Sequence, residues 1–194
     1  MDKFIKNYWN YYIELESQLL ELKRYVEFDK KNFQTYSIEI LKLFQTVCSE
    51  IDAAGKEIAL SFDEKFKPKD ANIKKWGYII QQNLKGIKNI KIIFNENIEL
   101  CPYKNWEYIE LISKKGKPYL KKAKDIDMII WWKHYNSIKH ERVGWVENET
   151  NYHLANLKNL LNAFCALFIL ETMYINSFCN EKKITESKLF KYIE

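Results

Sequence analysis

Asn136, His140 and Arg142 are the residues whose types and spacing could do chemistry. Asn136 and His140 are four residues apart, so on a helix they share a face one turn from each other, and Arg142 follows shortly after. A histidine with a pKa near neutrality can give or take a proton, and a guanidinium can hold the charge that grows on a phosphate. These three residues are the candidate catalytic group, and the chemistry they suit is proton transfer beside a phosphate group.

The same three residues also have a purely structural interpretation. Asn136 and His140 can satisfy backbone groups at a helix corner, and Arg142 can complement the C-terminal end of the helix dipole. His134 lies about 240° around the helix from His140, so we assign it no role. Whether His153 approaches the corner in space stays open.

The stretch Tyr135-Asn136-Ser137-Ile138-Lys139-His140 resembles the Arg-Asn-x-x-x-His signature of the HEPN superfamily. Asn136 and His140 match the family's spacing. Tyr135 stands where the family has arginine, and Lys139 and Arg142 are the nearest substitutes. HEPN domains are compact and all-α, and in HEPN ribonucleases two protomers form a shared cleft. The resemblance therefore implies a homodimer with a composite site that cleaves RNA.

The resemblance also implies a biological role as a toxin or phage-defence effector, with an antitoxin or another defence-system protein as candidate partner. Two other functions remain open. One is a catalytically silent HEPN-like domain that binds RNA, a nucleotide or a protein. The other is a helical dimerisation protein that uses its aromatic-rich first helix as the interface.

Helices must position the candidate catalytic group. We expect two antiparallel helices joined by a tight corner between Trp131 and Met173, and the second, Leu154 to Leu170, has almost no polar face. Apolar residues at helical spacing predict two earlier helices, over 4–26 and 40–58, and a shorter one over 71–84. On the first of these, Glu16 is assigned to a solvated face.

The spacing of apolar residues along the sequence changes from helical to alternating near residue 87. Alternating apolar residues over 90–100 predict a small β-hairpin, and residues 102–124 are expected to be part extended and part loop. Six lysines fall within eleven residues there: Lys114, Lys115, Lys117, Lys121, Lys122 and Lys124. They are either a phosphate-contacting lip for nucleic acid or an ordinary solvated loop.

We predict a single domain over 1–194, all-α, an antiparallel helical bundle with a small β-hairpin and loop insertion at about 87–124. For RNA binding, the candidate residues are Lys114, Lys115, Lys117 and Lys139. A chain of 194 residues with 47% apolar residues can build a substantial core, and its five glycines and three prolines exclude disordered and fibrous classes. The net charge of +5 permits nucleic acid without requiring it.

We expect no cofactor and no metal, because the sequence has neither a glycine-rich phosphate loop nor a cluster of ligands at metal spacing. Cys48, Cys101, Cys165 and Cys179 form no C-x-x-C pair, which favours a reducing compartment. The longest apolar run, Leu160 to Leu170, is about half of a membrane span, and the N-terminal residues do not resemble a signal peptide. The prediction is a cytoplasmic protein with no membrane partner.

Overall fold

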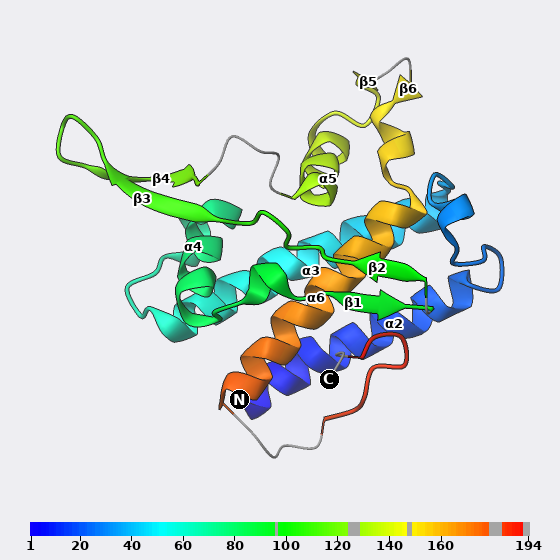
Figure 1. Cartoon of the computed structure of the whole chain (residues 1–194), viewed down its shortest axis with the longest axis horizontal. Coiled ribbons are helices and arrows are strands. Elements are labelled where there is room, and N and C mark those ends of the chain that lie inside the picture. The colour runs from blue at the N-terminus through cyan, green and yellow to red at the C-terminus, as the bar shows by residue number, and fades with distance from the viewer. Residues whose placement is uncertain (96, 124–128, 147–148, 179–183, 192–194) are drawn as a thin grey trace.

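The computed structural model describes residues 1–95, 97–123, 129–146, 149–178 and 184–191. Lys124 and Cys179 lie outside this described part. Three long helices, α2, α3 and α6, cross one another at the centre of the molecule, and the shorter elements surround them (Figure 1). The principal helices are α2 (Asn10–Leu22), α3 (Ile38–Phe62), α4 (Ile73–Asn83), α5 (Ile130–His140) and α6 (Leu157–Phe178).

The first predicted helix is a continuous helical run in three pieces. It begins with α1 (Asp2–Phe4), continues through a π-helix over Ile5–Trp9 and ends as α2 at Leu22. The assignment of Glu16 to a solvated face is wrong, because its side chain is only 2% exposed. Its carboxylate accepts hydrogen bonds from the Ser187 hydroxyl and from the Lys188 N–H at 2.8 Å. Glu16 therefore holds the C-terminal segment against α2.

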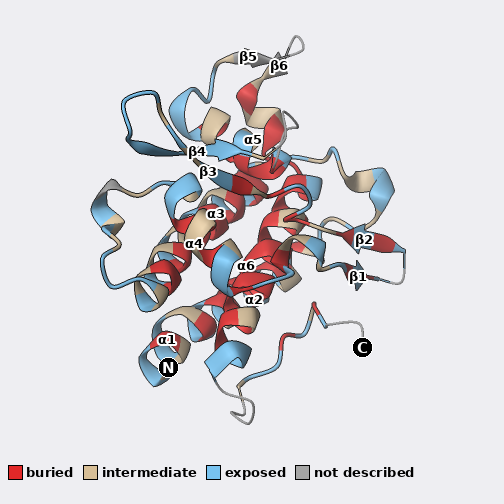
Figure 2. Cartoon of the chain, turned by 60° about the vertical axis from the view of Figure 1, so that its left-hand side comes forward, coloured by how far each residue is buried: buried red, intermediate tan, exposed pale blue. Residues whose placement is uncertain are grey.

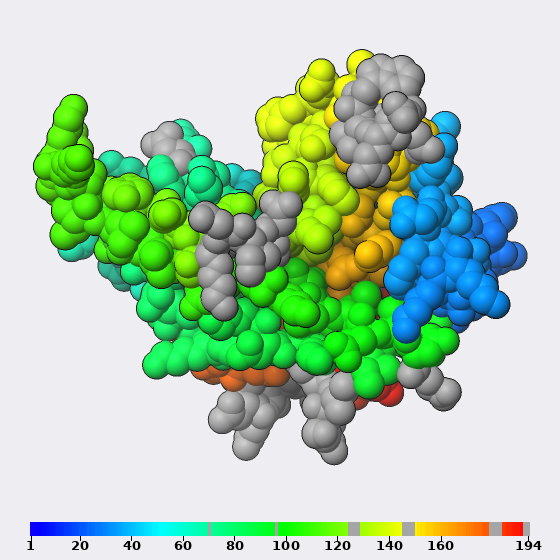
Figure 3. Space-filling view, turned by 45° about the horizontal axis from the view of Figure 1, so that its top comes forward, coloured from blue at the N-terminus to red at the C-terminus, as the bar shows by residue number. Residues whose placement is uncertain are grey.

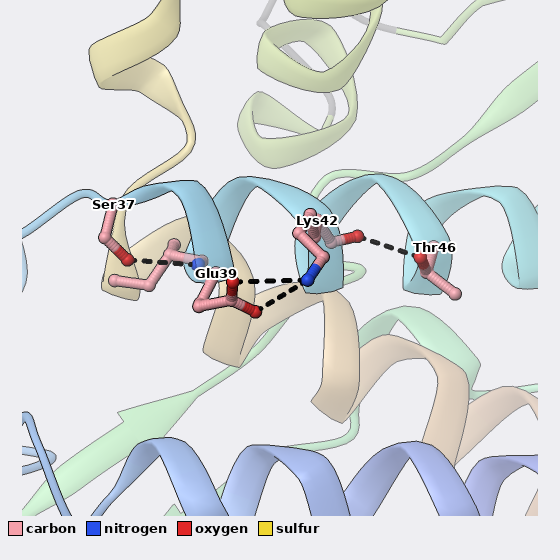
Figure 4. A network of polar contacts seen from close by, with 5 residues as sticks. Ser37, Glu39, Lys42 and Thr46 are labelled. Atoms are coloured by element: carbon pink, nitrogen blue, oxygen red, sulfur yellow. Dashed lines mark hydrogen bonds and ion pairs between the residues drawn. The ribbon is translucent and has the colours of Figure 1, made fainter.

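Helix α3 begins where the sequence supplies a cap. The Ser37 hydroxyl accepts a hydrogen bond from the Ile40 N–H at 3.2 Å, as an N-cap does. Figure 4 shows this cap beside the Glu39–Lys42 ion pair and the bond from the Thr46 hydroxyl to the Lys42 carbonyl. Both charged side chains are about two-thirds exposed, so the pair adds little to stability and the buried face of α3 supplies most of it.

Helix α6 is the core helix, as its nearly uniform apolar sequence predicts. Its residues are buried along most of its length, and Figure 2 shows it as the most continuously buried element. By length and composition it could cross a membrane, but 78% of its most apolar window is buried inside the protein. This burial is typical of the core helix of a soluble protein.

The all-α prediction is wrong, because three two-stranded antiparallel sheets accompany the helices. They are β1–β2 (Ile92–Phe94, Ile98–Leu100), β3–β4 (Tyr108–Ile112, Pro118–Lys122) and β5–β6 (Trp145–Val146, Glu149–Thr150). The first is the hairpin that alternating apolar residues predicted. The second was not resolved from the sequence, because lysines crowd its second strand and hide the alternation. The protein is mixed α and β, with a helical bundle at its centre.

The tight corner expected between α5 and α6 is also wrong. Residues 141–156 separate the two helices and contain β5, β6 and a short 3₁₀ helix, Asn151–Leu154. Helix α6 accordingly begins at Leu157, and Leu154 belongs to the preceding turn. The remaining 3₁₀ turns are Lys30–Asn32, Pro68–Asp70 and Ile87–Asn89.

Candidate functional site

Helix α5 positions the candidate site, and its two sides line different cavities. Ile129, Trp132, Lys133, Asn136 and Ser137 line a cleft on one side. Their spacing of three and four residues places them on one helical face. Another face of α5, with Ile130, Trp131 and His134, lines a second cavity. The side chains of Tyr135 and Ile138 point to neither cavity and are buried in the core.

The first cavity, which we call the basic cleft, lies between α5, the start of α4 and the β3–β4 hairpin. Its volume is about 570 Å³. Three of its lining residues are lysines, Lys74, Lys122 and Lys133, and none of the described residues that line it is a carboxylate. The charged side chains that the structure describes in the cleft are therefore all cationic, which favours an anionic ligand.

The hairpin brings part of the lysine-rich segment to this cleft. Tyr108 and Lys122 face each other across the two strands, and both line the cleft. Beyond them the hairpin projects from the body of the molecule (Figure 3). Lys114, Lys115 and Lys117 lie at its tip and are exposed, at a turn where Gly116 adopts a φ of +71°. These three of the four predicted RNA-binding lysines are thus displaced from the cleft along the same hairpin.

Asn136 is half-buried in the wall of the basic cleft. Its amide nitrogen donates to the Trp132 carbonyl at 3.0 Å, which fixes the side chain against its own helix. An amide carries two N–H groups and one accepting oxygen. The second N–H and the oxygen are therefore the parts of Asn136 that a ligand in the cleft can use.

His140 and Arg142 lie past the cleft, at the C-terminal end of α5. His140 is the last residue of the helix, and both side chains are exposed. The Arg142 guanidinium donates to the Gln45 side-chain carbonyl on α3 at 3.3 Å. Within the described residues, no hydrogen bond or ion pair joins Asn136, His140 and Arg142 to one another. The structure places the three at one end of α5 but does not assemble them into a bonded group.

Tyr135, which replaces the arginine of the HEPN signature, belongs to the core. It is 6% exposed and packs edge-to-face on Phe44 of α3, with ring centroids 6.3 Å apart. Burial raises the pKa of its hydroxyl to about 12. Lys139 lies over the same ring, its ammonium 5.6 Å from the centroid, so this predicted RNA-binding residue is not in the cleft.

Sequence reasoning missed the cleft lysines. Lys122 was noticed only as one of a run, while Lys74 and Lys133 were not singled out. The available signal was the helical spacing of Ile129, Trp132 and Asn136, which defines one face that includes Lys133. The position of Lys74 beside that face depends on tertiary packing, which no local pattern shows.

No family model, curated protein or solved structure matches this chain. The resemblance to the HEPN superfamily, carried by Tyr135 to His140, stays a prediction. Among the residues that the structure describes, no group of three or more His, Cys, Asp and Glu side chains is arranged to hold a metal ion.

Proposed function

We propose that the protein binds single-stranded RNA through the basic cleft and the β3–β4 hairpin. The observation that carries this proposal is the cleft itself, where Lys74, Lys122 and Lys133 line a cavity and no described carboxylate lines it. Lysines at a cavity of this kind contact phosphates, and phosphate contacts supply most of the affinity of non-specific RNA binding.

The walls of the cleft suit a nucleotide within the strand. Tyr108 and Trp132 give the cleft an apolar lining on which a ribose or the edge of a base can pack, and Asn136 offers hydrogen bonds. The strand can continue along the hairpin, where Lys114, Lys115 and Lys117 reach successive phosphates and the half-exposed Tyr119 offers a ring for stacking.

The test is RNA binding measured by fluorescence anisotropy at several salt concentrations. Each phosphate contact with a single strand contributes about −0.7 to the slope of log K against log salt. Lys122→Gln with Lys133→Gln should therefore make that slope about 1.4 shallower and weaken binding at every salt concentration. Lys114→Gln, Lys115→Gln and Lys117→Gln together should have a similar effect if the strand follows the hairpin.

The matched control is Lys30→Gln with Lys31→Gln, which removes the same charge from two exposed lysines that do not line the cleft. If the control weakens binding as much as the cleft variant, only net charge matters and the cleft has no special role. If wild-type protein fails to bind RNA at low salt, the proposal is wrong.

A second function is favoured by the exposure of His140 and Arg142 at one end of α5. We propose that the bound RNA is cleaved there without a metal ion. The ribose 2′-oxygen attacks phosphorus and loses its proton to a base, while the 5′-oxygen leaves with a proton from an acid. The products are a 2′,3′-cyclic phosphate and a 5′-hydroxyl.

This chemistry needs two proton-transfer groups, and the motif provides one histidine in each copy. We therefore propose a homodimer in which two copies of His140 share a site, as the HEPN resemblance implies. Exposed groups at a helix end are accessible to a second protomer. The same resemblance supports a role in the cytoplasm as a toxin or phage-defence effector, held in check by an antitoxin or another defence-system protein.

A further inference from the structure

A second cavity lies on the other side of α5, and the proposed function does not use it. We call it the histidine pocket. It has a volume of about 430 Å³ and lies between α5, the 3₁₀ turn before α6, the start of α6 and the segment after β2. Its polar lining includes His134, His153, Lys104, Lys158, Asn105 and Asn162, and none of the lining residues that the structure describes is a carboxylate.

His134 is held in one tautomer by a buried amide. The Asn159 amide nitrogen lies 2.8 Å from His134 Nδ1 and 2.7 Å from the Leu154 carbonyl oxygen. A carbonyl only accepts hydrogen bonds, so the atom facing it is the NH₂ group of Asn159. That group also donates to Nδ1 of His134, which leaves the ring proton on Nε2. The neutral His134 ring thus carries a hydrogen-bond donor at Nε2.

His134 is also kept in its neutral form. Burial is the largest effect and lowers the pKa of the imidazole. The hydrogen bond with Asn159 raises the pKa, the charges of Lys133, His153 and Lys158 lower it, and the net shift is downward. A neutral ring with its proton on Nε2 binds an anionic oxygen through a hydrogen bond, without a net charge of its own.

His153 has the opposite tautomer. Its Nδ1 lies within hydrogen-bonding distance of the Thr150 carbonyl oxygen, which can only accept, so Nδ1 carries the proton of the neutral ring. This contact holds the His153 ring against the turn before α6, and Nε2 of His134 is the imidazole atom that we assign to the ligand.

The positive charge of the pocket comes from lysines and not from the helix end. The first N–H groups of α6 are already bonded, Leu157 to the Thr35 carbonyl at 2.9 Å and Lys158 to the Phe33 carbonyl at 3.1 Å. The Asn159 N–H donates to the Asn156 side chain. Lys104 and Lys158, both exposed at the rim, therefore supply the charge, and two ammonium groups match a dianion.

We propose that the histidine pocket binds a small phosphate monoester whose organic part is rich in hydroxyl groups, a sugar phosphate. Lys104, Lys158 and the Nε2 proton of His134 bind the phosphate. The amides of Asn105 and Asn162 bind hydroxyl groups, because an amide offers both the donors and the acceptor that a hydroxyl group needs. A pocket of about 430 Å³ is large enough for a phosphate with an attached sugar.

The lining argues against a nucleotide in this pocket. Among its described lining residues, the one aromatic ring other than the imidazoles is Trp131, which is 4% exposed and donates its indole N–H to the Pro102 carbonyl at 2.9 Å. Little ring surface is left for stacking a base. The pocket also lies across α5 from the basic cleft, so this inference does not depend on RNA binding.

Isothermal titration calorimetry with the full chain tests the proposal. Ribose 5-phosphate is the probe, with ribose, inorganic phosphate and AMP as comparisons. Ribose 5-phosphate should bind at millimolar concentrations or below, ribose should not bind, and inorganic phosphate should bind more weakly. If phosphate binds as tightly, the sugar is not recognised and the proposal is overturned. AMP binding tighter than ribose 5-phosphate would show contact with a base and also overturn it.

Two variants locate the site. Lys104→Gln with Lys158→Gln changes only exposed side chains, so the fold should persist by circular dichroism, and the Kd for ribose 5-phosphate should rise at least tenfold. A basic-cleft variant that keeps Lys133, Lys74→Gln with Lys122→Gln, should leave that Kd unchanged. An unchanged Kd in the pocket variant, or an equal loss in the cleft variant, would place binding elsewhere and overturn the proposal.

Discussion

Individual residues of the motif have different surroundings, and these decide which of them can react. Asn136 is fixed to its own helix, Tyr135 is part of the core, and His140 and Arg142 are exposed. The Arg142 guanidinium is steadied by Gln45 yet remains open to solvent. The proposed cleavage therefore depends on His140 and Arg142, because the buried Tyr135 cannot supply the positive charge of the arginine in the HEPN signature.

Removing the His140 imidazole should abolish RNA cleavage. The expected result for purified wild-type protein in EDTA is a 2′,3′-cyclic phosphate product, and for His140→Ala no product at all. Arg142→Ala should lose about 10²-fold or more, because a preorganised cation facing the developing charge supplies a few kcal/mol. Product ends are identified by mass spectrometry.

Tyr135→Phe is the matched control for this experiment. It removes a hydroxyl from the same helix, keeps the packed ring and should cleave like wild type. A folded His140→Ala protein that cleaves as fast as wild type would exclude the motif as the catalytic site, and wild-type protein without activity would leave RNA binding as the function.

The sequence identified residue types well but not their environments. His140 and Arg142 were singled out because their residue types alone indicate which chemistry they can perform. Glu16 was assigned to solvent because its neighbours on α2 are polar, yet it accepts two backbone N–H bonds from residues more than 170 positions away. His134 was given no role for a similar reason, since its partner Asn159 comes from another helix. The local spacing of residues in a sequence does not predict contacts between segments that are far apart in the chain.

The elements were more predictable than the residues they contain. Helices α3, α4 and α6 and the β1–β2 hairpin follow the predicted spacing of apolar residues, because each must bury one face or all of its surface. Prediction failed for β3–β4 and for the connection between α5 and α6. These segments bury few side chains, so their sequences lack the regular spacing of apolar residues that indicates a buried face.

Helices α3 and α4 meet at a glycine, and this contact can be tested. A Cβ built on Gly55 would lie 2.8 Å from Cε3 of Trp76, closer than carbon atoms approach. The Trp76 ring cannot easily move, because it is fully buried and its indole N–H donates to Asp52 at 3.0 Å. The position thus excludes a side chain.

Gly55→Ala should destabilise the protein although alanine favours helices. The propensity gain is about 1 kcal/mol, while overpacking a rigid core costs about 1 to 3 kcal/mol. We expect a net loss of up to about 2 kcal/mol in urea unfolding. In a Trp76→Leu background the same change should be neutral or stabilising, and a loss of the same size in both backgrounds would show that the ring is not the cause.

At the scale of the whole molecule, the proposed catalytic function requires assembly. One copy presents a single His140 at an exposed helix end, so the composite site implies a dimer. Light scattering at micromolar concentration should give twice the mass of the 23.5 kDa chain. A monomer mass at every concentration tested would contradict both the dimer and the shared site.

The core of the molecule also contains a carboxyl group that should make its stability depend on pH. Glu171 on α6 is fully buried, and neither of its oxygens has a hydrogen-bond partner among the described residues. Burial raises its pKa well above the ordinary value, and nearby Glu50 raises it further. Burial also raises the pKa of Glu50 on α3, to about 7.

Both groups hold protons in the folded state that they lose in the unfolded state above about pH 4.5. The folded protein therefore binds more protons than the unfolded one, and stability must fall as pH rises. Glu50 contributes to this fall up to about pH 7, and Glu171 continues it to higher pH. A fully buried group contributes up to about 1.4 kcal/mol for each pH unit in its window.

Glu171→Gln should remove the larger part of this dependence, because an amide of the same shape has no proton to lose. The melting temperature of wild-type protein should fall between pH 5 and pH 8.5, and that of the variant should fall less, so that the variant is the more stable protein at pH 8.5. Glu14→Gln, an exposed substitution on α2, should follow wild type at every pH. Parallel curves for wild type and Glu171→Gln would mean that Glu171 is ionised in the folded protein, with a counterion supplied from outside the described residues.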